Sequence, residues 1–327
     1  MKNIILSIIV IGRNEESGLV GLRNSLQPLV ERAVCETIYV DSASEDNSAN
    51  LARVLFDVTI LLGEDENLSA SAGRSIGVQN SAGKWLLFLD GDMLLEAAIV
   101  DDILIHISRG IETDGLVGTY VHEYDDRSVR EQKYHSDKNG FADHFGGAVL
   151  LPASALHSEN WDPRLFSNEE IDLYTRLRQR GVRVKLVDRP FIRHHTEKFS
   201  KAQILKGIFI RKDSYLGKKF FGVGQMLLAR ITDGKFFSLI RWLPEPFVLW
   251  LGILISLICL TLDGESIGLL IFALSIVFVC FRKSPRYVII YAAFFPQAIY
   301  GFLNFSPNWR PTVISIFRQQ SVRGEKE

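Results

Sequence analysis

The amino-acid sequence predicts an α/β fold, with an open, mostly parallel sheet, followed by apolar C-terminal helices. Four short apolar runs have the form of strands that helices cover on both faces: residues 4–11, 37–40, 58–62 and 85–89. Three amphipathic segments alternate with these runs: residues 16–32, 44–56 and 69–81. Alternating strands and helices are typical of an α/β sheet. A hydrophobic content of 47% and a charged content of 23% exclude a disordered chain.

Charge is distributed unevenly along the 327 residues, although the net charge is −1. Residues 1–200 carry 21 Lys and Arg against 31 Asp and Glu, residues 201–241 carry 9 against 2, and the remainder carries 7 against 5. Three cysteines exclude a disulfide scaffold. The sequence therefore predicts four regions: an α/β domain at 1–200, a basic and aromatic linker at 201–241, an apolar region at 242–310 and a tail at 311–327.

The apolar region predicts membrane-spanning helices at about 243–262 and 266–281, and a doubtful third at about 287–307, which Pro296 and Gln297 interrupt. The alternative is a buried helical hairpin. The link between the first two stretches is acidic, whereas the flanking segments are basic, and basic flanks stay in the cytoplasm. We therefore expect a multi-pass protein of the cytoplasmic membrane with residues 1–241 on the cytosolic face.

The linker at 201–241 interleaves basic and aromatic residues directly before the first apolar stretch. This pattern favours an interfacial segment on anionic membrane lipid over a solvated charged helix, in which the aromatic rings would be exposed. Nucleic-acid binding is disfavoured because the basic residues are confined to this linker.

Acidic side chains follow the predicted strands at the edge where α/β sheets bind ligands: Glu15, Asp41, Asp90 and Asp92. Asp90-Gly91-Asp92 follows a buried strand, and two carboxylates at this spacing can hold Mg²⁺ or Mn²⁺ with positions left for a diphosphate. An ordinary turn is the alternative. Neither a Walker motif nor a G-x-G-x-x-G sequence after the first strand is present to bind phosphates through glycine-rich backbone.

Six blocks in order resemble the family 2 glycosyltransferases of the GT-A fold: residues 7–16, 39–48, 71–80, 85–92, 146–148 and 168–178. The resemblance covers roughly residues 4–200. It implies an inverting, metal-dependent enzyme that transfers a sugar from a nucleotide-sugar donor to an acceptor. With the apolar region, it suggests a membrane-borne acceptor, a polyprenyl phosphate or a lipid-linked glycan. Two alternatives are a catalytically silent membrane scaffold and a sugar nucleotidyltransferase, which would need a glycine-rich loop after the first strand.

The resemblance also implies the functions of single residues. Donor contacts are expected from five residues: Arg13, Glu15, Asp41, Arg74 and Asp90. Asp92 is expected to be the metal ligand, with His195 favoured slightly over His194 as a second. Arg13 departs from the family pattern, and its guanidinium is suited to stacking on a base. The donor sugar, the nucleobase and the acceptor do not follow from the sequence.

Glu170 lies where inverting members of the family carry the general base that deprotonates the acceptor. Its competing interpretation is structural, because Ser167 and Glu170 fit a capping box ahead of a helix at 171–180. Glu169 is a neighbouring like charge that would raise the pKa of Glu170. Many members carry Glu-Asp at this pair of positions, so a carboxylate is retained here on a longer side chain.

Overall fold

The computed structural model describes residues 4–124, 126–196, 215–235, 237, 244–261, 265–282, 286–293 and 295–319. They form two compact units. Unit 1 consists of Met1–Lys198 with Asn308–Glu327, and unit 2 of Phe199–Pro307. Of the predicted linker, only 215–235 and 237 are described, and the remainder of that prediction lies outside the described residues.

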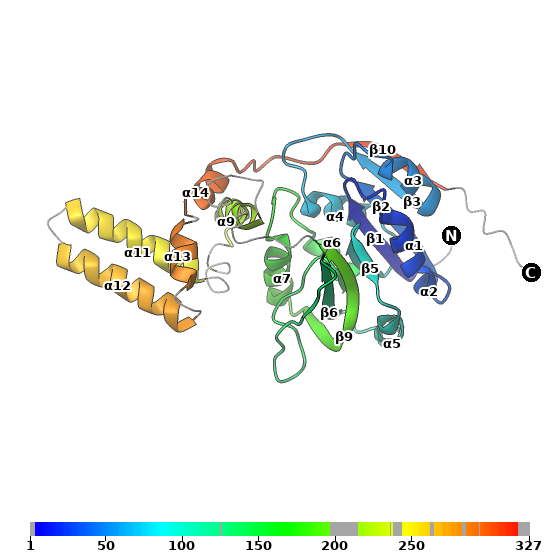
Figure 1. Ribbon diagram of the computed structural model, residues 1–327, viewed down its shortest axis with the longest axis horizontal. Coiled ribbons are helices and arrows are strands. Elements are labelled where there is room, and N and C mark those ends of the chain that lie inside the picture. Colours follow the sequence, from blue (N-terminus) through cyan, green and yellow to red (C-terminus); the bar gives the residue numbers. More distant parts are fainter. Residues whose placement is uncertain are drawn as a thin grey trace, which may run out of the picture. The chain divides into compact units, whose positions relative to one another are not determined.

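Unit 1 contains one sheet, which within the described residues has ten strands in the order β10-β3-β2-β1-β4-β8-β6-β9-β5, with β7 on β6. Figure 1 shows this sheet with α4 beside β1 and β2. The strands are β1 (Leu6–Gly12), β2 (Cys35–Asp41), β3 (Val58–Leu62), β4 (Trp85–Asp90), β5 (Met93–Leu95), β6 (Asp114–Tyr124), β7 (Val129–Gln132), β8 (Val149–Pro152), β9 (Arg183–Thr196) and β10 (Val313–Arg318).

The prediction of a mostly parallel sheet is wrong for the sheet as a whole, which is mixed. The first four strands are parallel, as predicted, in the order β3-β2-β1-β4. Beyond them β8 pairs antiparallel with both β4 and β6, and β9 runs parallel to β6. The apolar runs of the first four strands made them recognisable. By contrast, β6 is buried over its first half and only partly buried beyond it, and β9 mixes buried, partly buried and exposed residues.

Helices and strands alternate in the first half of unit 1. The helices of this unit are α1 (Leu19–Ser25), α2 (Gln27–Val30), α3 (Ser48–Leu55), α4 (Ala70–Gln79), α5 (Val100–Arg109), α6 (Ala153–Ser158) and α7 (Glu169–Gln179), with a 3₁₀ turn η1 at Ala97–Ile99. The helix predicted at 16–32 is two short helices, because Pro28 lacks the N–H that a continuous helix needs. Gly77 lets α4 approach β1 closely, since a Cβ there would overlap Ile9.

The C-terminal strand β10 belongs to unit 1, not to a separate tail as predicted. It pairs antiparallel with β3, from Val313 opposite Leu62 to Arg318 opposite Val58. The guanidinium of Arg53 on α3 lies 3.8 Å from the ring centroid of Phe317. β10 therefore covers the edge of β3, which would otherwise expose unpaired backbone groups.

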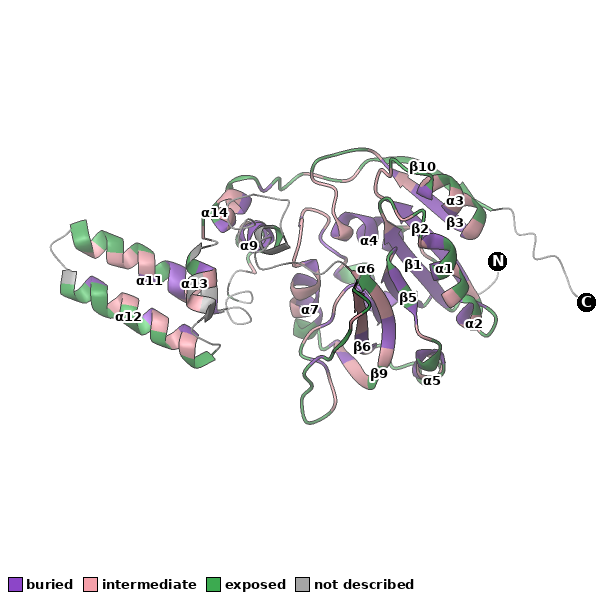
Figure 2. Ribbon diagram, viewed as in Figure 1, coloured by how far each residue is buried: buried purple, intermediate pink, exposed green. Residues whose placement is uncertain are grey.

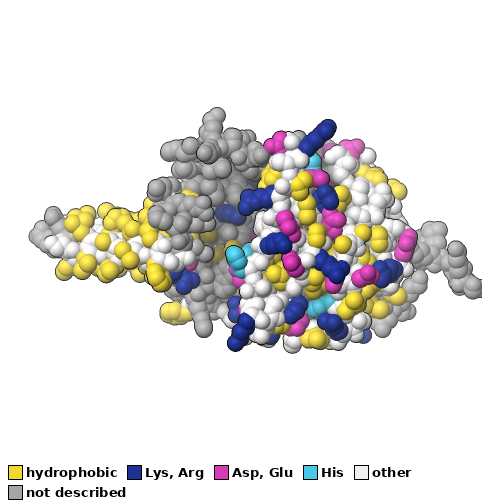
Figure 3. Space-filling model, turned by 60° about the horizontal axis from the view of Figure 1, so that its bottom comes forward, with side chains coloured by type: hydrophobic (Ala, Val, Ile, Leu, Met, Phe, Trp, Pro, Cys, Tyr) yellow, Lys and Arg dark blue, Asp and Glu magenta, His cyan; other side chains and the backbone are white. Residues whose placement is uncertain are grey.

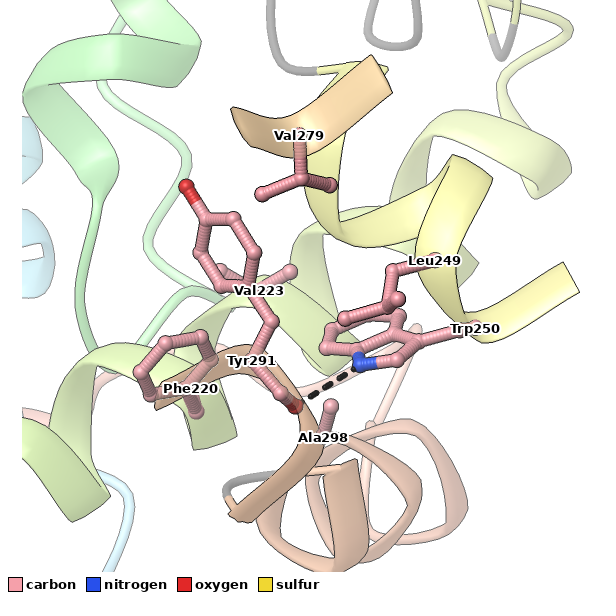
Figure 4. Close-up of a cluster of buried hydrophobic side chains, with 7 residues drawn as sticks. All are labelled: Phe220, Val223, Leu249, Trp250, Val279, Tyr291 and Ala298. Atoms are coloured by element: carbon pink, nitrogen blue, oxygen red, sulfur yellow. Dashed lines mark hydrogen bonds between the residues drawn. The ribbon is translucent and has the colours of Figure 1, made fainter. Parts of the chain in front are cut away.

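Unit 2 is helical and comprises α9 (Tyr215–Thr232), α11 (Pro244–Thr261), α12 (Glu265–Arg282), α13 (Arg286–Ala293) and α14 (Phe295–Leu303). A cluster of buried side chains joins these helices, and Figure 4 shows Trp250 of α11 donating from its indole N–H to the carbonyl oxygen of Tyr291 at 3.0 Å. In α11 and α12, Arg282 is paired with the buried Glu245 at 3.0 Å, and Ser256 donates to the carbonyl of Gly268, so the two helices pack as an antiparallel hairpin.

The predicted membrane-spanning helices are not supported. Within the described ranges, none of the helices combines the length and the apolar character needed to cross a bilayer. The stretches at 243–262 and 266–281 correspond to α11 and α12, each of 18 residues. Both carry ionisable residues at an end, which shortens their apolar length. The doubtful third stretch is divided between two short helices, α13 and α14.

Candidate active site

A cavity of about 240 Å³ opens at the carboxyl ends of β1, β2 and β4, beside the first residues of α4. It is lined by Ile11, Gly12, Arg13, Glu15, Ser42, Leu68, Ser69, Ala70, Asp90, Gly91 and Asp92. Parallel strands end together at this edge, which is where α/β sheets bind ligands. Three of the predicted donor-contact residues and the predicted metal ligand Asp92 therefore share one cavity.

Three carboxylates crowd the acidic side of this cavity. The side chain of Asp90 is 29% exposed and that of Asp92 40% exposed. Glu15 lies next to them, since a Cβ at Gly91 would fall 2.5 Å from its Cγ. Burial and, after it, the charges of Asp92 and Asp90 together raise the pKa of Glu15 to about 7. Such a group of like charges is suited to binding a cation.

His194 is the histidine that reaches the acidic cluster. Its Nε2 lies 2.9 Å from Asp92 Oδ2. Burial disfavours the charged form of His194, but the hydrogen bond and charge of Asp92 outweigh burial and raise its pKa. His195 is exposed, and only its backbone N–H points to Asp92, at 3.4 Å from the carbonyl oxygen.

The candidate second metal ligand is therefore His194 and not His195. Both residues lie on β9, where successive side chains point to opposite faces of the sheet. The register places His194 opposite Met93, the residue that follows Asp92. Shifting the register by one residue would exchange the two histidines.

Asp92 and His194 fit a divalent cation that shares its coordination with a ligand. No group of three or more His, Cys, Asp or Glu residues forms a complete metal site in the part of the chain that the structure describes. Cations bound with nucleotides commonly take one or two ligands from the protein and the others from phosphates and water. The carboxylate suits Mn²⁺ or Mg²⁺, and the imidazole nitrogen beside it favours Mn²⁺ of the two, because Mg²⁺ prefers oxygen ligands.

Arg74 lies beneath the cavity instead of lining it. Its side chain is 1% exposed, and its guanidinium donates to Asp90 at 2.6 Å and to Glu169 at 2.9 Å. Glu170 Oε1 is 4.0 Å from Nη1 of the same guanidinium. Nη1 and Nη2 are committed to these carboxylates, whereas the buried Nε has no hydrogen-bond partner. Arg74 thereby links the acidic cluster to the start of α7, and it is not among the residues that line the cavity.

Glu169 and Glu170 begin α7, and the capping box that was the alternative interpretation of Glu170 is not formed. The residue before the helix is Asn168, with a left-handed φ of 61°, and its side chain does not cap the helix. Glu170 is the second helical residue, one position short of the third, which a capping box requires. Its side chain is 26% exposed, whereas that of Glu169 is 7% exposed. Burial and the charge of Glu170 raise the pKa of Glu169.

Asp41 and Arg13 occupy different environments at the other side of the cavity. Asp41 is buried, and its carboxylate accepts from the backbone N–H of Ser44 at 2.9 Å and from the Ser44 hydroxyl at 2.6 Å. It thereby holds the turn after β2. Arg13 lines the cavity with a 45% exposed side chain and pairs with Glu45 at 3.3 Å. Arg13 is therefore free to reorient towards a ligand, because an exposed ion pair is weak.

Comparison with known proteins shows which family the N-terminal half of the chain resembles. Residues 7–158 match the model of the Glycosyl transferase family 2. These residues form a family 2 glycosyltransferase domain. The match ends before α7, so Glu169 and Glu170 lie outside it.

Two curated relatives match parts of the chain. An uncharacterized glycosyltransferase of Haemophilus influenzae is 35% identical over 88 residues, 27% of this chain and 29% of that protein. Glycosyltransferase AglE of Haloferax volcanii is 27% identical over 138 residues, 41% of this chain and 45% of that protein. The chain therefore spans less than half the length of both relatives.

Among solved structures, residues 1–349 of S. aureus TarS in complex with UDP superpose with a TM-score of 0.50 at 15% identity, covering 92% of this chain and 90% of that chain. At this identity the similarity shows the fold alone. The GT-A-like fold predicted for the domain is confirmed by the family match and this superposition together.

Sequence reasoning missed several residues that shape the site of the glycosyltransferase domain. A Cβ at Gly147 would fall 2.5 Å from Asp90 Oδ2 and 2.6 Å from Arg74 Nη2, so the absent side chain makes room for that ion pair. The sequence signal for Gly147 is its position in the block at 146–148, one of the six that resemble the family. His122 and Gln132, which form hydrogen bonds on the far side of His194, carry no motif that indicates their position.

Proposed function

We propose that the protein is an inverting, metal-dependent glycosyltransferase that transfers a sugar from a nucleotide-sugar donor to a membrane-borne acceptor. The observation that carries the proposal is the shared cavity of Glu15, Asp90 and Asp92, with His194 at its border and Arg74 connecting it to Glu170. The UDP bound to S. aureus TarS supports a nucleotide as part of the donor.

Donor binding is assigned to the cavity residues. Asp92 and His194 would hold the divalent cation, which when bound supplies positive charge that stabilises the leaving diphosphate. Glu15 would face the nucleoside, and Arg13 would turn from Glu45 to stack on the base. Asp90 would approach the ribose from the position in which Arg74 holds it.

Glu170 is the candidate general base. It would take the proton from an acceptor hydroxyl while that oxygen forms the bond to the anomeric carbon and the nucleoside diphosphate leaves from the opposite face, which inverts the configuration. Glu169 is less suited to this, because it is buried and already accepts from Arg74. A phosphate acceptor is ionised beforehand, so Glu170 would contribute less with a polyprenyl phosphate.

The test is turnover of a panel of nucleotide sugars by the purified chain with Mn²⁺ or Mg²⁺, followed by transfer to hydroxyl acceptors. We expect donor turnover to be lost in Asp92→Ala and transfer to fall at least 100-fold in Glu170→Gln. Glu112→Gln, which changes an exposed acid, is the matched control. Nucleotide binding without turnover of any donor would favour the silent scaffold. Full activity of Glu170→Gln on hydroxyl acceptors would remove the general-base assignment.

The membrane-borne acceptor is supported by the exposed apolar surface of the α11–α12 hairpin. Side chains such as Leu257, Leu270 and Val277 are 55%, 59% and 62% exposed. Figures 2 and 3 show this hairpin as largely exposed and covered with hydrophobic side chains. A surface of this kind is typical of a lipid-facing or partner-facing element. We propose that it attaches the enzyme to the cytoplasmic membrane, with unit 1 on the cytosolic face.

The pairing of β10 with β3 restricts how the chain meets a membrane. Unit 2 is joined to unit 1 at both of its ends, since β10 follows it and lies in the same sheet as β1. Both ends must therefore lie on the same side of the membrane. Flotation with anionic vesicles is the test: binding that Leu257→Glu and Leu270→Glu together abolish supports attachment, and undiminished binding of that variant removes it.

A further inference from the structure

Four polar side chains form a row across neighbouring strands and end at the acidic cluster. Gln132 on β7 lies beside His122 on β6, with 3.0 Å between Gln132 Oε1 and His122 Nε2. His122 and His194 are register partners on β6 and β9, and their Nδ1 atoms are 3.2 Å apart. His194 Nε2 then lies 2.9 Å from Asp92 Oδ2. Figure 1 shows β6 and β9 side by side.

The chemistry of the row gives it a direction. An amide oxygen only accepts, so with Oε1 of Gln132 turned towards it His122 carries its hydrogen on Nε2 and a lone pair on Nδ1. In this arrangement His194 donates from Nδ1 to His122. A neutral His194 is thereby left with the lone pair of Nε2 directed at the carboxylate of Asp92. Two lone pairs at this separation repel each other unless a proton or a cation lies between them.

The surroundings favour a divalent cation at this point. Glu15, Asp90 and Asp92 line the same cavity, so three carboxyl groups converge there, and a divalent cation can interact with several of them where a single proton cannot. A histidine that binds a metal through one nitrogen generally donates its other N–H to a neighbouring acceptor, which fixes the tautomer and the ring orientation. In this chain His122 is that acceptor. The hydrogen bond from His122 Nε2 to Gln132 leaves the Nδ1 atom of His122 able to accept from His194.

We propose that His122 and Gln132 are positioning residues for the cation site, which hold His194 in the tautomer that directs Nε2 at Asp92. This inference rests on the proposed metal dependence. Neither residue contacts the cation itself. Their contribution to folding is expected to be small, because all four residues of β7 are exposed and His122 is only partly buried.

The test is Mn²⁺ binding to the full chain, measured by the electron paramagnetic resonance signal of free Mn²⁺ and requiring no turnover. His122→Phe removes the acceptor, and we expect a 10- to 100-fold weaker affinity. His122→Asn places an amide oxygen near the position of Nδ1 and should restore affinity to within about threefold of wild type. Gln132→Leu should weaken it less than His122→Phe. His157→Phe, at an exposed histidine of α6, is the matched control and should leave it unchanged.

Mn²⁺ binding to Asp92→Asn distinguishes failure of the positioning proposal from failure of the proposed function. Mn²⁺ binding that depends on Asp92 but is equal in wild type, His122→Phe and Gln132→Leu would overturn the positioning proposal and leave the proposed function intact. Absence of Mn²⁺ binding in wild type would overturn both. The ¹⁵N shifts of the His194 ring provide a second readout, since the proposal requires a protonated Nδ1 and an unprotonated Nε2 with Mg²⁺ present. The opposite tautomer in wild type would also overturn it.

Discussion

The guanidinium of Arg74 donates to Asp90 across 2.6 Å from a position that is 99% buried beneath the cavity. The same group donates to Glu169, so one cation supports two carboxylates on different elements, the end of β4 and the start of α7. Because these elements carry the candidate donor and acceptor sides of the site, Arg74 sets their separation. It is better described as a positioning residue than as the donor contact that the sequence predicts.

Replacing Arg74 should destabilise the fold strongly. Arg74→Met leaves two carboxylates without their cation, and removing one partner of a buried ion pair costs about 3–5 kcal/mol. The loss should be smaller at pH 5 than at pH 8, because the raised pKa of Glu169 lets this carboxyl become neutral as the pH falls. Urea denaturation measures the free energy of unfolding. Arg109→Met, at an exposed arginine of α5, is the control, and an equal loss in both variants would contradict the prediction.

Gly147→Ala should disturb the site without a change of charge. The added Cβ would meet both Asp90 Oδ2 and Arg74 Nη2 at about the length of a hydrogen bond, so one of them must move. We expect UDP with Mn²⁺ to bind roughly tenfold more weakly, or about 1.4 kcal/mol, by calorimetry. Gly21→Ala in α1 is the control, because its Cβ would meet only Leu94 at 3.7 Å. Unchanged UDP affinity in Gly147→Ala would show that the ion pair tolerates displacement.

Glu15→Gln should stabilise the metal-free protein in a pH-dependent way. The folded-state pKa of Glu15 is raised from 4.5 to about 7, so the native carboxyl favours the protonated form. The folded wild-type protein therefore has its full stability below pH 4.5, where this carboxyl is protonated. It loses stability as the pH rises through 7 and the buried carboxyl has to ionise. The variant should therefore gain little over wild type at pH 5 and about 1–3 kcal/mol at pH 8.

Thermal unfolding at the two pH values measures this gain for Glu15→Gln. Added Mn²⁺ should reduce the gain at pH 8, since a cation relieves the same repulsion in wild type. Glu112→Gln is the control, with no expected change between the two pH values. A stabilisation of Glu15→Gln that is independent of pH would contradict the electrostatic explanation.

Phe317→Ala should weaken the attachment of β10 to the sheet. The ring is 39% exposed and stacks under the guanidinium of Arg53, so we expect a loss of about 1–2 kcal/mol. Ile314→Ala on the same segment, at a side chain that is 66% exposed, should cost less. Urea denaturation measures both losses. Faster hydrogen exchange of the β3 amides in Phe317→Ala would show that the loss occurs at this edge, and unchanged exchange would contradict the prediction.

The sequence alone allowed the first four strands to be located and the acidic residues at their ends to be recognised. Continuous apolar runs report burial on both faces, and a strand end is a local event, so Asp90 and Asp92 were found without knowledge of the tertiary structure. The family match over 7–158 confirms the glycosyltransferase domain to which they belong. The single helix predicted at 16–32 is wrong, because Pro28 cannot donate the backbone hydrogen bond that a continuous helix needs.

The tertiary structure decided the features that depend on pairing between distant segments. The register of β9 on β5 and β6 selects His194 over His195, since adjacent residues of a strand face opposite sides of the sheet. Burial of Arg74 depends on α7, which follows it by about a hundred residues. The addition of β10 to β3 joins opposite ends of the chain. Composition and spacing describe neighbours in the sequence, whereas these contacts arise from long-range strand pairing and packing.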